Sequence, residues 1–299
     1  MFCGLHGFTC VENQTLAFLR ERGMDIRPLY RDAAAPLGAL HDAFVRRGER
    51  PEAFCPATRV QDLAKARGII SLALSMEPDA GPAWGAAMDG DCDVAILVRV
   101  KPEFTKSALH ARGLREDHYV LARSANKRLM LLNDIPDLSL LVTREAFEAA
   151  YGGGYFTLAA LRPLDGGDRQ WLWDTREHRA ESFVEFACPP EDACPGDGAA
   201  SRLRDIAGAC KVLRKRAAEY YGLYVDTGFI LEAMPEYERA HAALEYCCLK
   251  PGLPHERTRA ELARLIETDN ATMAKLKTAL GGSGENPQPR PEQKGGDTA

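Results

Sequence analysis

A cysteine at the start of a helix is the first feature of this chain that could do covalent chemistry. In the segment FTCVENQTLAFLRERG, Thr9 and Glu12 have the spacing of a capping box, which predicts Thr9 as the N-cap and Cys10 as the first helical residue. Unpaired backbone N–H groups and the positive end of the helix dipole favour a thiolate at that position. The pattern therefore predicts a nucleophile at Cys10.

A histidine and an acid follow in positions that suit a base and the group that orients it. The segment HYVLARSANKRLMLLND predicts strands over 118–123 and 128–133, joined by a polar turn. Antiparallel pairing would bring His118, which opens the first strand, beside Asp134, which follows the second. The carboxylate could then orient the imidazole, and the imidazole could serve as base toward a cysteine. Asn133 is the alternative orienting residue, since an amide serves in some cysteine triads, but we expect it to point to the opposite face of the strand.

Each of these residues also has an ordinary structural interpretation. Cys10 could be a buried, inert thiol, and His118 a strand histidine with satisfied hydrogen bonds. Asp134 precedes Ile-Pro-Asp, which is typical of a turn. Cys3 is a competing nucleophile, but no helix start follows it. The order of cysteine, histidine and acid along one chain favours the catalytic interpretation.

The elements that would position these residues indicate an α+β fold. Helices are predicted in PLGALHDAFVRRGERPEA, with Leu37, Leu40, Phe44 and Val45 inward, and in TRVQDLAKARG and TREAFEAA. Strands are predicted in IISLALS, DVAILVRV and YFTLAALRP, whereas MEPDAGPAWGAAMDGD is predicted as a loop and KPEFTKSALHARGLRED as a polar stretch. Helices followed by an antiparallel meander are typical of the α+β class.

The pattern further divides the chain into a domain over 1–161, an irregular connector over 162–198, a helical region over 199–280 and a disordered tail over 281–299. The first helix of the helical region carries a row of basic residues. We expect a solvated face there, with a docking surface for an acidic partner as the sharper alternative. The row comprises Arg202, Arg204, Lys211, Arg214, Lys215 and Arg216.

Composition excludes several classes of function. A net charge of −5 argues against general nucleic-acid binding, and the longest apolar stretches are too short to span a membrane. The first ten residues lack the basic start and apolar core of a secretory signal. Nine cysteines, an odd count without a signal, favour a reducing, cytoplasmic location and free thiols.

The cysteine spacing does not predict a metal site. Cys188 and Cys194 do not form a C-x-x-C pair, and neither do the adjacent cysteines at 247 and 248. Cys3, His6 and Cys10 form a tighter cluster, but a fourth ligand is not evident. We therefore expect neither a metal nor an organic cofactor.

The order of these motifs resembles a papain-like cysteine fold over residues 1–161. The motifs are Cys10 at a helix start, GDCDVAILVRV, H-Y-V-L, L-L-N-D and T-R-E-A-F before a final strand. The pattern is similar to the double-glycine-leader peptidases of bacteriocin exporters, and closer to the N-terminal domain of the butirosin biosynthesis protein H family. The resemblance implies Cys10 as nucleophile, His118 as base and Asp134 as orienting residue. Leader peptidases carry a glutamine shortly before the cysteine that helps to form the oxyanion hole. GLHGFT has none, so His6 or backbone N–H groups would have to replace it.

The resemblance implies an acyltransferase of secondary-metabolite biosynthesis. Cys10 would take an acyl group from an acyl carrier protein or a small thioester donor and pass it to an amine acceptor, without a cofactor. A peptidase or amidohydrolase with the same nucleophile is one alternative. A catalytically inactive papain-like domain, with the helical region binding a partner, is the other.

Overall fold

The computed structural model describes residues 7–51, 53–54, 58–90, 93–109, 118–134, 137–174, 183, 185–189, 199–250 and 255–281. The chain divides into two compact units whose sequences interleave. Unit 1 comprises 1–29 and 58–171, and unit 2 comprises 30–57 and 172–299. The expected boundary near residue 161 therefore differs from the structure, because 30–57 belongs with the C-terminal helices. Its apolar residues Leu37, Leu40 and Phe44 are buried in unit 2.

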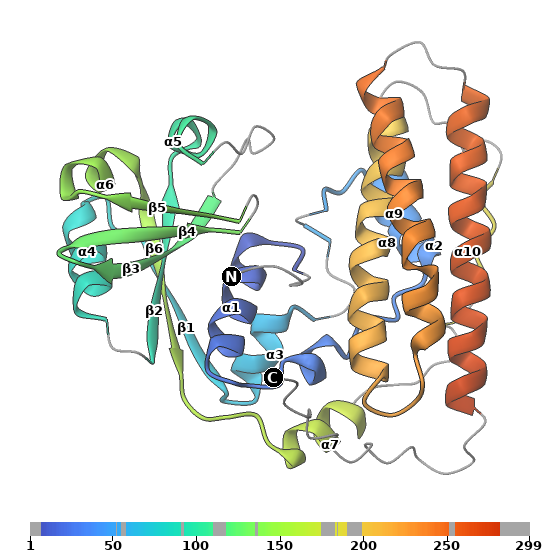
Figure 1. Cartoon of the computed structure of the whole chain (residues 1–299), viewed down its shortest axis with the longest axis horizontal. Coiled ribbons are helices and arrows are strands. Elements are labelled where there is room, and N and C mark those ends of the chain that lie inside the picture. The colour runs from blue at the N-terminus through green and yellow to red at the C-terminus, as the bar shows by residue number, and fades with distance from the viewer. Residues whose placement is uncertain are drawn as a thin grey trace, which may run out of the picture. The chain divides into compact units, whose positions relative to one another are not determined.

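Unit 1 contains a six-stranded antiparallel sheet, which confirms the α+β class. The strands are β1 (Ile70–Ser75), β2 (Val94–Val100), β3 (His118–Ala125), β4 (Arg128–Asn133), β5 (Leu138–Val142) and β6 (Tyr151–Ala160), in the order β1-β6-β2-β3-β4-β5 (Figure 1). The predicted hairpin is β3–β4, and β3 runs two residues further than expected. Asn126 and Lys127 alone form its turn, with φ of 51° and 62°, the positive values that tight hairpin turns require.

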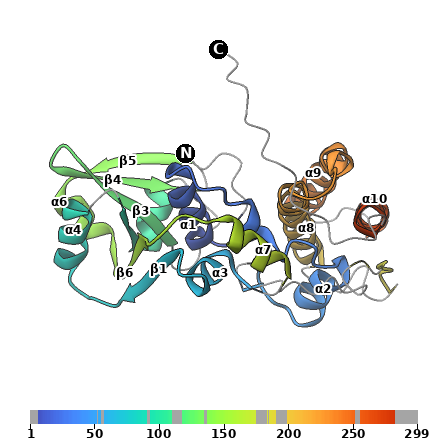
Figure 2. The ribbon, with the colours of Figure 1, turned by 90° about the horizontal axis from the view of Figure 1, so that it is seen from below.

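Helices cover the two faces of this sheet. They are α1 (Cys10–Glu21), α3 (Val60–Ala66), α4 (Ala80–Asp89) and α6 (Arg144–Ala150). Unit 1 also contains α5 (Pro102–Ser107) and most of α7 (Gly166–Asp174). Figures 1 and 2 show α4 and α6 on one face and α1 and α3 on the other. In β2, Ile96 and Val98 pack with Ala83 of α4, and the alternating residues between them turn toward the face that α1 covers.

The prediction of a loop over 76–91 was wrong, because α4 forms there despite its glycines and proline. The Asp79 side chain caps the helix by accepting a hydrogen bond from the Gly81 backbone N–H. Pro82 lies in the first turn, where a helix loses no hydrogen bond to it. Ala80, Ala83 and Ala87 are then buried against the sheet, so packing outweighs weak local propensity.

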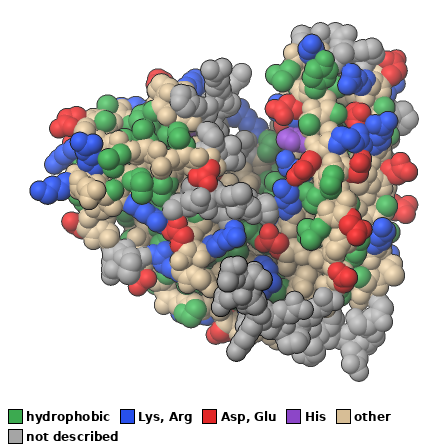
Figure 3. Space-filling model, in the orientation of Figure 1, with side chains coloured by type: hydrophobic (Ala, Val, Ile, Leu, Met, Phe, Trp, Pro, Cys, Tyr) green, Lys and Arg blue, Asp and Glu red, His purple; other side chains and the backbone are tan. Residues whose placement is uncertain are grey.

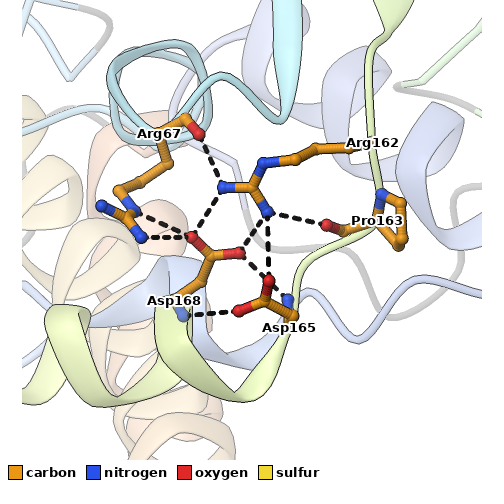
Figure 4. A network of polar contacts seen from close by, with 5 residues as sticks. All are labelled: Arg67, Arg162, Pro163, Asp165 and Asp168. Carbon is orange, nitrogen blue, oxygen red and sulfur yellow. Dashed lines mark hydrogen bonds and ion pairs between the residues drawn. The ribbon is translucent and has the colours of Figure 1, made fainter.

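The connector expected to be irregular also contains a helix, α7, which a charged network anchors to unit 1 (Figure 4). Asp168 is fully buried and accepts hydrogen bonds from Arg67 Nε at 2.8 Å and from Arg162 Nη1 at 2.6 Å. The two guanidinium groups hold the pKa of Asp168 well below its usual range. The Asp165 backbone N–H donates a hydrogen bond to the Asp168 carboxylate, and the Asp168 backbone N–H donates one to the Asp165 carboxylate. The network therefore links α7 to the end of α3 and to the segment after β6.

Unit 2 is helical, as predicted for 199–280. Its helices are α2 (Leu37–His41), which continues into a π-helical turn over Asp42–Arg46, and α8 (Ala199–Tyr221), α9 (Gly228–Leu249) and α10 (His255–Gly281). Of the predicted tail over 281–299, Gly281 ends α10 and the remainder lies outside the described residues. Every helix of the described part of the chain is too short or too polar to cross a membrane.

The basic row on α8 forms the expected solvated face only in part: Arg202 is exposed and Arg204, Lys211 and Lys215 are partly exposed, whereas two members are buried. Arg214 is fully buried, with its Nε 2.6 Å from Asp269 Oδ1, and donates to the carbonyl groups of Ala33 and Ala35. Arg216 is also buried. Figure 3 shows acidic and basic side chains interspersed over the helices of unit 2. Two of the six basic residues are therefore buried inside unit 2, and the other four remain accessible to solvent.

Candidate active site

Local capping positions Cys10 as the sequence predicts. Thr9 is the N-cap, and its Oγ1 accepts a hydrogen bond from the Glu12 backbone N–H at 3.2 Å. The Glu12 carboxylate reaches back to the backbone N–H of Phe8 at 2.6 Å, one residue before the cap. Both contacts fix the chain on each side of Cys10, which is the first residue of α1 and is partly exposed.

The protonation state of Cys10 differs from the expectation of a thiolate. Burial of the sulfur is the largest effect and raises the pKa of Cys10 to about 11. The backbone N–H groups of Tyr119 and Val11 lower the pKa, and the negative charge of Asp134 raises it. The helix start is therefore outweighed by desolvation, and the thiol is protonated near neutral pH. An attack by Cys10 on a substrate requires a base.

His118 is the base that the sequence predicts, and it adjoins Tyr119, whose backbone acts on the Cys10 thiol. It is the first residue of β3 and is buried, and its Nε2 lies 2.5 Å from Oδ1 of Asn133, the last residue of β4. An amide oxygen only accepts hydrogen bonds, so Nε2 carries the proton in this contact. In the neutral ring Nδ1 then holds the free electron pair. The next residue, Tyr119, supplies the backbone N–H that acts on the Cys10 thiol.

Asp134 lies beside the same ring nitrogen, but Asn133 makes the hydrogen bond. Asp134 Oδ1 is 3.6 Å from His118 Nε2, and both side chains are buried. The expectation that Asn133 points away was wrong. β4 ends at Asn133 and Asp134 lies in the following turn, so strand alternation no longer separates the two side chains. Two acceptors therefore approach one N–H group, the amide closely and the carboxylate at a longer distance.

Sequence reasoning missed Asn13, which links the acid to the loop before the nucleophile. Its Nδ2 donates to Asp134 Oδ2 at 2.9 Å, and its Oδ1 accepts from the Gly7 backbone N–H at 2.8 Å. A Cβ at Gly7 would lie 2.6 Å from Asn13 Oδ1, so only glycine fits there. The one signal in the sequence is that Asn13 follows Cys10 by three residues, which places both on the same side of a helix.

Gln14 is a second buried polar residue of α1 that sequence reasoning missed. It is fully buried, and its Nε2 donates to the Leu132 carbonyl group at 3.3 Å and to that of Tyr119 at 3.5 Å. These bonds attach α1 to both strands of the hairpin. Gln14 follows Cys10 rather than preceding it, so it does not match the glutamine of the leader peptidases.

The structure thus brings groups from α1, β3 and β4 together at one end of the sheet, where β3 begins at His118 and β4 ends at Asn133. A partly exposed thiol, an imidazole held by Asn133 and a second acceptor beside that imidazole can support nucleophilic attack assisted by a general base. Cys3 and His6, the alternatives considered above, lie outside the described residues. Within the described ranges, no three His, Cys, Asp or Glu side chains are grouped to hold a metal ion. Comparison of the chain with protein-family models and with curated proteins finds no match.

Proposed function

We propose that this chain is a cysteine-dependent acyltransferase of papain-like fold. Cys10 is the nucleophile, His118 the base, and Asn133 and Asp134 the groups behind the base. The observation that carries the proposal is the 2.5 Å contact between His118 Nε2 and Asn133 Oδ1. It leaves Nδ1 as the proton acceptor on a residue adjacent to the backbone group that acts on the Cys10 thiol.

In the first step, His118 Nδ1 takes the thiol proton while the Cys10 sulfur attacks the acyl carbon of a thioester. The tetrahedral adduct then expels the donor thiol, which takes the proton from the imidazolium. With a pKa of about 11, Cys10 is a poorer leaving group than an ordinary thiol, whose pKa is about 8.5. The adduct therefore collapses toward the acyl-enzyme, which supports a thioester as the donor.

In the second step, an amine attacks the acyl group on Cys10. His118 accepts a proton from the amine and returns it to the departing sulfur, which otherwise leaves poorly because of its raised pKa. Amide formation from a thioester is downhill, so the transfer runs forward. The choice of a carrier protein as donor and of a biosynthetic amine as acceptor rests on the sequence resemblance.

The experiment is incubation of the full chain with a panel of acyl thioesters, followed by intact-mass measurement and peptide mapping. We expect one acyl group on Cys10, and its loss as an amide when an amine is added. Loss of the group at the same rate without an amine would instead favour hydrolysis. Cys188→Ala, which removes another partly exposed thiol, is the matched control and should react normally. A folded Cys10→Ala variant that still turns over would refute the proposal.

A further inference from the structure

A second thiol lies against an imidazole in unit 2. The sulfur of Cys188 is 3.6 Å from Nε2 of His41, the last residue of α2. Cys188 is partly exposed, whereas His41 is buried. Both residues belong to unit 2, whereas the candidate active site belongs to unit 1.

The segment that carries Cys188 is held firmly on α10. Asn270 Oδ1 accepts from the Phe186 backbone N–H at 3.0 Å, and its Nδ2 donates to the Phe186 carbonyl group at 3.0 Å. The Phe186 ring packs on His41, with ring centroids 5.1 Å apart. Gly38 permits this close packing, because a Cβ there would lie 3.2 Å from the Phe186 ring. The thiol and the imidazole therefore have a fixed relation.

A cavity of about 530 Å³ lies beside this thiol, a volume that suits a small molecule. Leu262 and Ile266 give it an apolar side, with Arg259 before them and Glu267 after them on the same helix. The two charged positions are eight apart in the sequence, which corresponds to about 12 Å along the helix. The remaining lining residues are Cys188, Ala263 and Asn270.

We propose that Cys188 and His41 form a site for thiol–disulfide exchange with a small disulfide that carries both carboxylate and ammonium groups. His41 accepts the thiol proton, and the Cys188 sulfur attacks one sulfur of the bound disulfide. The disulfide bond of the ligand breaks as the mixed disulfide with Cys188 forms, and the departing thiolate takes the proton from the imidazolium. Arg259 binds a carboxylate of the ligand and Glu267 an ammonium group, about a dozen ångströms apart along α10.

The test uses the full chain and two probes, oxidised glutathione and the uncharged disulfide of 2-mercaptoethanol. Peptide mapping follows the rate of mixed-disulfide formation at Cys188 and at Cys248, a thiol of α9 that is also partly exposed. We expect Cys188 to react first, and His41→Gln to slow it by about a hundredfold, the lower end of what a positioned base contributes. Circular dichroism checks that this variant is folded.

Charge variants on exposed positions of α10 test the ligand class without disturbing the core. Arg259→Gln and Glu267→Gln should each slow the reaction with oxidised glutathione by about fivefold, the scale of an exposed ion pair, and leave the uncharged probe unaffected. If Cys188 reacts no faster than Cys248 with either probe, the pair is a packing contact and the proposal fails. If the charge variants change both probes alike, the assignment of a doubly charged ligand fails.

Discussion

Removal of His118 should change how the acylation of Cys10 depends on pH. Because burial raises the pKa of Cys10 to about 11, roughly one molecule in ten thousand carries the thiolate at pH 7. If a base removes the thiol proton during the attack, the acylation rate is no longer limited by this small thiolate fraction. In His118→Ala only the spontaneously ionised thiol reacts, so the acylation rate should follow its titration.

The expected loss at neutral pH is about two to four orders of magnitude, the range for removal of a general base. The upper limit agrees with the thiolate fraction of about one in ten thousand that follows from the raised pKa. The acylation rate of the variant should then rise about tenfold with each pH unit until the thiol itself titrates. The parent protein, which does not depend on prior ionisation, should show no such slope.

The assay is single-turnover acylation by a reactive thioester, followed by intact mass from about pH 6 to about pH 10. His41→Gln is the matched control, because it removes an imidazole that lies beside a thiol in unit 2. Its acylation rate at Cys10 should equal that of the parent. An alkylation profile of Cys10 that levels off near pH 7 would refute the reasoning from burial. A His118→Ala variant with the parent rate and slope would refute the base.

Three further predictions follow from the contacts described above. Asn133→Ala should slow acylation roughly 10- to 100-fold, because the buried imidazole N–H loses the closer of its two acceptors at a cost of about 1–3 kcal/mol. Asp134→Asn should cost less and shift alkylation of Cys10 to lower pH, since the charge of Asp134 raises the pKa of the thiol. Equal effects of the two substitutions in single-turnover assays would contradict the geometry. Arg214→Met should destabilise the protein by about 3–5 kcal/mol in urea unfolding, because it leaves the buried charge of Asp269 without its partner. Adding Asp269→Leu should recover part of this loss. Additive costs of the two substitutions would argue against the pair. Asp168→Asn should lower the free energy of unfolding by about 2 kcal/mol at pH 7. Because the pKa of this carboxyl is lowered in the folded protein, the difference in stability between variant and parent should shrink as the pH falls below about 4. A difference in thermal unfolding that stays constant with pH would contradict the network.

Local signals were sufficient to predict much of the site. The capping box around Thr9 acts over four residues, so Cys10 could be placed at the first turn of a helix from the sequence alone. The hairpin is also local, and its pairing brings His118 near Asp134 as predicted. The choice between Asn133 and Asp134 required the three-dimensional structure, because it depends on where β4 ends to within one residue.

Features that depend on distant packing could not be predicted. The pKa of Cys10 is set by burial that the rest of unit 1 supplies, and this outweighs the helix start. α4 forms because its alanines pack on the sheet, although glycine and proline predict a loop. β5 is a five-residue edge strand after a turn, which is too short for a clear alternating pattern. The pairing of 30–57 with α8 depends on contacts between residues far apart in the chain.

The buried contacts of Arg214 have a consequence for the order in which the chain is synthesised. This side chain binds the carbonyl groups of Ala33 and Ala35, which precede it by 181 and 179 residues. A ribosome adds about 5–20 residues per second, so Arg214 is synthesised roughly 10–40 s after Ala33 and Ala35. During this interval the nascent chain carries the apolar side chains of Leu37 and Phe44 without the helices that bury them. A truncated gene product ending near residue 171 would keep 30–57 without α8, the helix that α2 contacts in unit 2.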